Sequence, residues 1–177
     1  MTTYFTIDRK RRLEPNLTLE VKRCEDPELP PELRNHLEEM FPGGVSDHGR
    51  RFFILGQFLE VERVIELTWE FLRRAHFPNR PSRYVCTYAW RTLEEAQRFR
   101  SQSEDTGVPI WEVESETCFI ANMNLLNLQF SSIATSRRAH IYWQGLEAAD
   151  DTYNHIHGQT WEVLLPPSAK VIRQVID

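Results

Sequence analysis

The spacing of apolar residues along the chain predicts a mixture of strands and helices. Short runs rich in β-branched and aromatic residues predict strands at 2–7, 84–90, 108–113, 118–120, 161–165 and 171–176. Apolar residues at helical spacing predict helices at 32–41, 55–77, 93–100, 123–130 and 132–144. Pro31 and Thr92 are typical of helix starts and Gly145 of a helix end. The pattern indicates an α+β fold with a largely antiparallel sheet.

The connections between these elements predict how they pair. Only residues 166–170 separate the last two strands, which predicts that those strands form an antiparallel pair. Strands 108–113 and 118–120 are close enough for a hairpin around residues 114–116. Helix 55–77 has a broad apolar face and is expected to lie mostly in the core, with Glu66 and Arg73 on its remaining surface.

Composition narrows the class of protein. The chain has 177 residues, of which 41% are hydrophobic and 27% charged, as expected for one globular domain spanning 1–177. A net charge of −5 argues against general nucleic-acid binding. The apolar runs are far shorter than the roughly 18 residues of a membrane span, and residues 1–12 lack a secretory pattern. We expect a cytoplasmic protein with no membrane association and with three reduced cysteines.

Several common catalytic motifs are missing from the sequence. Neither GxGxxG nor GxxxxGK occurs, and GxSxG and HExxH are absent as well. His155 and His157, together with His140 or Asp151, have the spacing of a weak metal-ligand set. Because an HxH pair is found far more often without a metal, we predict no metal site.

One carboxylate stands out in the predicted strands. Glu162 interrupts an apolar run, where acidic residues are disfavoured, and it shares a strand face with Leu164. It is either a functional carboxylate or a strand-edge glutamate that faces water.

Basic and aromatic residues give two further candidates. The run 9–12 and the arginines before strand 84–90 are suited to holding a phosphate, although such a run is also typical of a solvated turn. Tyr88 and Trp90 share one strand face, which fits either a surface that stacks on a planar ring or a core aromatic pair.

Four segments in fixed order carry a resemblance that covers nearly the whole chain. They are Tyr4-Phe5-Thr6-Ile7-Asp8-Arg9; Ser82-Arg83 with strand 85–90 and helix 94–99; residues 110–114 with 122–126; and residues 139–145 with Trp161-Glu162-Val163-Leu164-Leu165-Pro166. This ordered set resembles a bacterial uncharacterised family of the ADP-ribosyltransferase fold, similar to anti-CRISPR ADP-ribosyltransferases.

The resemblance implies two small, mainly antiparallel sheets around an NAD cleft with flanking helices. It implies transfer of ADP-ribose from NAD, as substrate, to an unidentified macromolecular acceptor such as a protein, with release of nicotinamide. Glu162 is the implied catalytic residue. It accepts a hydrogen bond from the ribose 2′-hydroxyl and stabilises a transition state that resembles an oxocarbenium ion. The implied NAD contacts are Thr6, Asp8, Arg9, Ser82, Arg83, Tyr88 and Trp90.

Two departures from the family pattern keep other functions open. Thr6 stands where the family often has His, and Thr160 stands where arginine-modifying toxins carry a second glutamate, so an arginine acceptor is not expected. The alternatives are a catalytically inactive nucleotide- or protein-binding module of the same fold, and an NAD hydrolase. A transferase that removes an RNA 2′-phosphate is disfavoured by the net charge.

Overall fold

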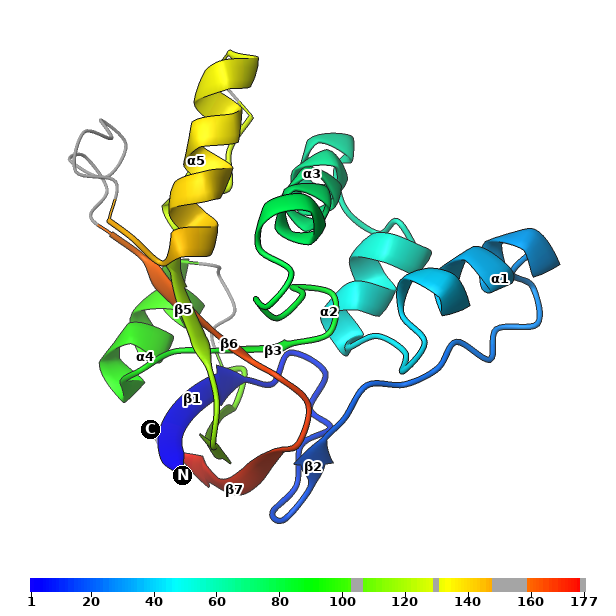
Figure 1. Cartoon of the computed structure of the whole chain (residues 1–177). Helices are drawn as coiled ribbons and strands as arrows, with labels where there is room; N and C mark the ends of the chain where they lie inside the picture. Colours follow the sequence, from blue (N-terminus) through cyan, green and yellow to red (C-terminus); the bar gives the residue numbers. More distant parts are fainter. Residues whose placement is uncertain (103–106, 129–130, 148–158, 176–177) are drawn as a thin grey trace.

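A computed structural model describes residues 1–102, 107–128, 131–147 and 159–175. It has an α+β fold with two small antiparallel sheets, as the sequence predicts (Figure 1). The four-stranded sheet has the order β1 (Thr2–Ile7), β4 (Ile110–Ser115), β7 (Ala169–Val175) and β2 (Thr18–Leu19). The three-stranded sheet has the order β3 (Thr87–Ala89), β6 (Trp161–Leu165) and β5 (Phe119–Asn122).

The helices surround these sheets. They are α1 (Pro31–Met40), α2 (Asp47–Gly49), the π-helical turn η1 (Arg50–Ile54), α3 (Glu60–His76), α4 (Leu93–Gln102), the 3₁₀ turn η2 (Met123–Leu125) and α5 (Ser132–Gln144). In Figure 1, α1 and α2 lie on the opposite side of the sheets from α4. The predicted helix 55–77 begins later, at Glu60, because Gly56 adopts a left-handed conformation with φ of 56°. The predicted helix 123–130 is a single turn in its described part.

The two predicted strand pairings are wrong. The expected hairpin of 108–113 with 118–120 does not form, because β4 pairs with β1 and β7 whereas β5 pairs with β6. The closing strands β6 and β7 likewise belong to different sheets. Pro166 and Pro167 have no N–H to donate to a ladder, so the chain turns a corner between the sheets there.

A short bridge connects the two sheets. Phe5 of β1 and Trp90, just after β3, exchange backbone hydrogen bonds of 2.9 and 2.8 Å. Next to this bridge the Thr6 hydroxyl donates to the Tyr88 carbonyl at 2.7 Å. The end of β1 is therefore fixed beside β3, and residues from both sheets meet at one place.

The central strand β6 is buried on both faces. Val163 and Leu165 pack in the core between the two sheets. Leu164, on the other face, packs with Trp69 and Trp143, which α3 and α5 contribute. Glu162 lies on this second face, as predicted from its alternation with Leu164, and is 2% exposed. The alternative of a strand-edge glutamate facing water is therefore wrong.

Helix α3 shows only part of the burial expected from its pattern. Trp69 is fully buried, as predicted, but Val61, Val64 and Phe71 of the predicted apolar face are exposed, whereas Glu66 and Arg73 are buried. The buried charges are tolerated because each has an ion-pair partner at close range. Across the described ranges, no helix combines the length and apolar character needed to cross a membrane.

Candidate functional site

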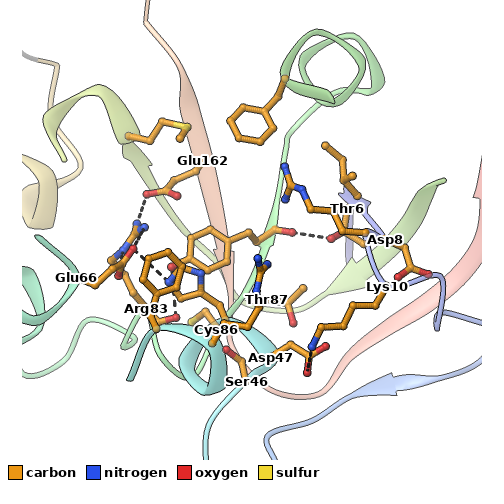
Figure 2. Close-up of a pocket in the computed structure, with 18 of the residues that line it drawn as sticks. Thr6, Asp8, Lys10, Ser46, Asp47, Glu66, Arg83, Cys86, Thr87 and Glu162 are labelled. Carbon is orange, nitrogen blue, oxygen red and sulfur yellow. Dashed lines mark hydrogen bonds and ion pairs between the residues drawn. The ribbon is translucent and has the colours of Figure 1, made fainter. Parts of the chain in front are cut away.

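A cavity of about 890 Å³ lies where the joint between the sheets meets α2, η1 and α3 (Figure 2). This volume is in the upper part of the usual range for ligand sites, roughly 300–1,000 Å³. Of the catalytic and NAD-contacting residues that the resemblance implies, all except Ser82 line it; these are Thr6, Asp8, Arg9, Arg83, Tyr88, Trp90 and Glu162. Figure 2 shows Glu66, Arg83 and Glu162 on one side and Thr6, Asp8 and Lys10 on the other.

Glu162 is held by two donors on one of its oxygens. Its Oε1 accepts a hydrogen bond from the Tyr142 hydroxyl at 2.6 Å and forms a close ion pair with Nη1 of Arg83. Within the described part of the chain, the other oxygen, Oε2, accepts no hydrogen bond. Because Glu162 lines the cavity, Oε2 is available to a ligand that donates a hydrogen bond.

Arg83 is shared between two carboxylates. Its Nε and Nη2 donate to Glu66 at 2.9 and 2.8 Å, which is a two-point contact along one edge of the guanidinium. Its Nη1 faces Glu162 and also donates to the Tyr142 oxygen at 2.5 Å. The site therefore has two carboxylates on one guanidinium and retains one negative charge when both are ionised and the neighbouring His48 is neutral.

Burial and charge fix the protonation of the groups around this pair. Burial opposes ionisation of Glu66, but Arg83 and His48 outweigh it and hold the pKa of Glu66 well below its ordinary value. Burial raises the pKa of Tyr142 well above 10.0, so its hydroxyl stays protonated and donates to Glu162. Burial also raises the pKa of the Cys86 thiol to about 12, which argues against a thiolate nucleophile in the cavity.

Aromatic rings form another wall of the cavity. The His48 ring lies between Phe52 and Tyr88, with centroid distances of 4.3 and 4.4 Å. Its Nε2 is 3.2 Å from Oε1 of Glu66, at ion-pair distance but off the line of a hydrogen bond. The Arg83 guanidinium lies over the Tyr88 ring at 5.0 Å. The aromatic rings of this wall therefore lie next to the carboxylate of Glu66 and the guanidinium of Arg83.

The end of β1 provides the polar wall opposite. Asp8 is buried, and its Oδ2 accepts a hydrogen bond from the Leu13 N–H at 2.7 Å, which orders the turn after the strand. Arg9 lines the cavity with its guanidinium 5.7 Å from the Phe99 ring. Lys10 pairs with Asp47 at 2.9 Å. This wall therefore brings two cations, Arg9 and Lys10, to the end of the cavity away from Glu162, together with two carboxylates.

Two of the predicted contacts have a different or additional role in the structure. Ser82 lies outside the cavity lining and donates to Glu70 at 2.9 Å beneath α3, so no contact with NAD is expected there. Trp90 lines the cavity but packs against Phe99 at 4.6 Å in a core cluster, as the alternative of a core aromatic predicts. His155 and His157 lie outside the described residues.

The sequence did not identify three members of the site: His48, Glu66 and Tyr142. Glu66 was assigned to the polar surface of its helix because charged residues are usually solvated there. A signal was present, since Glu66, Glu70 and Arg73 follow one stripe of the helix at spacings of four and three. His48 has no comparable pattern around it.

Comparison with protein families finds a match over most of the chain. The family described as protein of unknown function (DUF2441) matches residues 47–177. The matched segment includes α2, α3 and β6 and therefore both carboxylates, but it excludes β1. Among curated proteins, none matches this sequence.

Proposed function

The chain belongs to the DUF2441 family, and from the cavity of this member we propose an NAD-dependent ADP-ribosyltransferase with an ADP-ribosyltransferase-like fold. One observation carries the proposal: Tyr88 of β3, Glu162 of β6 and Arg9 of the turn after β1 line one cavity. The resemblance required these side chains to converge. Tyr88 and Glu162 lie on paired strands of one sheet, and Arg9 reaches the same cavity from the end of a strand in the other sheet.

The distribution of charge in the cavity supports this chemistry. Cleavage of the bond between nicotinamide and ribose develops positive charge on the ribose. Glu66 and Glu162 share a single guanidinium, so with His48 neutral this group of side chains offers one unbalanced negative charge to that cation. Arg9 at the other end offers a cation to the pyrophosphate.

The residues then take defined parts in the transfer. Oε2 of Glu162 accepts a hydrogen bond from the ribose 2′-hydroxyl, and Tyr88 stacks on the nicotinamide ring. The bond between the ribose C1′ and the nicotinamide nitrogen breaks, and nicotinamide leaves with the electron pair. The acceptor forms the new bond to C1′ and gives up its proton. The acceptor is an unidentified macromolecule such as a protein, and water in its place makes the enzyme an NAD hydrolase.

A second candidate is a nucleotide-binding module without catalysis. The observation that favours it is the direct contact of Arg83 with Glu162, which neutralises part of the charge that the transfer requires. This candidate predicts affinity for NAD with no release of nicotinamide.

Incubation with NAD labelled in its adenylate half, in a bacterial lysate, tests the proposal. The wild-type protein is expected to label an acceptor and to release nicotinamide, and Glu162→Gln is expected to do neither. Glu70→Gln is the matched control, because Glu70 is a buried glutamate on α3 that does not line the cavity.

Each result points to one function. Nicotinamide release without a labelled product indicates the hydrolase, or an acceptor missing from that lysate. NAD binding measured by calorimetry, with NAD intact after long incubation, supports the binding module. Neither binding nor turnover by the wild-type protein overturns the proposal.

A further inference from the structure

Arg83 has two edges with which it can grip a carboxylate, and the two glutamates receive different ones. Glu66 takes the edge formed by Nε and Nη2 and uses both of its oxygens. Glu162 meets Nη1 alone, through Oε1. The two-point contact is the more directional of the two, so Glu66 sets the plane of the guanidinium.

Glu66 is itself firmly placed. It is buried on α3, and His48 stands 3.2 Å from the same Oε1 that accepts from Arg83. Burial disfavours the loss of its contacts, because a buried carboxylate without its ion-pair partners is costly. The guanidinium plane is therefore defined by a side chain on a different element from Glu162.

Without Glu66, Arg83 would have one buried carboxylate left. A guanidinium beside a single carboxylate prefers the two-point geometry, which here engages Oε2 of Glu162 as well as Oε1. The oxygen that now faces the cavity without a donor would then be occupied by the protein's own arginine.

We infer that Glu66 is a positioning residue, which holds Arg83 by two points and so keeps Oε2 of Glu162 open to a hydroxyl group of the ligand. The inference rests on the proposed function for the identity of that ligand, the ribose of NAD. Glu66 has a second consequence there, since it supplies one of the two carboxylate charges that face Arg83.

The test compares Glu66→Gln with Glu66→Asp. An amide offers one acceptor oxygen and turns donor N–H groups toward the guanidinium, so Glu66→Gln removes the two-point contact. A crystal structure of this variant is expected to show Arg83 in two-point contact with Glu162. Nicotinamide release should fall about ten- to a hundredfold in kcat, with a smaller change in KM, and Glu66→Asp should recover part of it.

Glu70→Gln is the control for a general effect of losing a buried carboxylate from α3. All variants are assayed at a temperature where circular dichroism shows them folded, and Glu66→Asp serves alone if Glu66→Gln does not fold. The inference is overturned if Arg83 keeps its place in Glu66→Gln, or if kcat stays within about twofold of wild type although Arg83 has moved. A wild-type protein without NAD turnover, whose Arg83 nevertheless shifts in Glu66→Gln, defeats the proposed function and leaves the positioning role standing.

Discussion

Helix α3 buries two glutamates one turn apart, and the two differ in how fully their surroundings satisfy them. In the closed cluster (Glu70, Arg73, Arg74 and Ser82), one carboxylate receives two guanidinium groups and a hydroxyl, and each of its oxygens accepts two hydrogen bonds at 2.7–2.9 Å. In the open cluster (Glu66, Arg83, Tyr142 and Glu162), one guanidinium serves two carboxylates.

The two clusters differ in net charge and in whether every carboxylate oxygen already accepts a hydrogen bond. The closed cluster carries a surplus positive charge and ties α3 to its surroundings, because Arg74 also donates to the Met40 carbonyl at 2.7 Å and Arg73 to the Arg80 carbonyl at 2.9 Å. The open cluster carries a surplus negative charge and turns a free acceptor toward the cavity. A buried ion pair by itself therefore says little about function, and its unsatisfied atoms say more.

The largest expected effect comes from breaking the closed cluster. Glu70→Gln leaves the buried Arg73 without its counter-ion and should lower the free energy of unfolding by about 3–5 kcal/mol. Urea unfolding followed by circular dichroism measures this loss. Glu162→Gln should cost less, because Arg83 keeps its two-point pair with Glu66. Equal losses in the two variants would contradict the larger contribution of the closed cluster to stability.

The next effect concerns activity and should show the reverse order. Glu162→Gln is expected to lower kcat for nicotinamide release by about 10²–10³, because the charge that stabilises the cationic transition state is lost. Glu70→Gln should remain within about twofold of wild type wherever it is folded. A nicotinamide assay under saturating NAD measures both. An active Glu162→Gln variant contradicts the catalytic role of this carboxylate.

The third effect is a pH dependence of stability in the open cluster. The pKa of Glu66 is lower in the folded protein than its ordinary value of 4.5, so its ion pair stabilises the fold above that pH and loses this contribution as the pH falls further. The wild-type free energy of unfolding should therefore decline below about pH 4.5, and Glu66→Gln should decline less steeply. Urea titrations at a series of pH values measure the two slopes, and parallel curves would rule out this linkage.

Sequence reasoning predicted the elements better than their pairing. The α+β class, β6 with Glu162 and Leu164 on one face, and α5 ending at Gly145 are all confirmed. The pairing of the last two strands was wrong, because a short connection is equally compatible with a hairpin and with a corner between two sheets. Only the burial of both faces of β6, a property of the assembled fold, decides between them.

In the candidate site, too, sequence reasoning identified local features and missed long-range contacts. Glu162 and Tyr88 were found because a carboxylate or a pair of aromatics is conspicuous within a strand of a few residues. Glu66 was missed because polar helix positions are normally solvated, and nothing local shows that the turn before β3, 17 residues later, supplies a buried arginine for it. A single sequence does not show which charged residues far apart in the chain pair in the folded protein.

The smallest expected effect tests whether Thr6 belongs to the site or only to the joint between the sheets. Its hydroxyl donates to the Tyr88 carbonyl, so Thr6→Val should lower the free energy of unfolding by about 1 kcal/mol. If the hydroxyl oxygen also accepts a hydrogen bond from NAD, the dissociation constant measured by calorimetry rises about fivefold or more in addition. Thr6→Ser retains the hydroxyl and should restore both quantities. Loss of stability with unchanged NAD affinity would confine Thr6 to the joint, and contact with the ligand at this end of the cavity would then fall to Arg9 in the turn after β1.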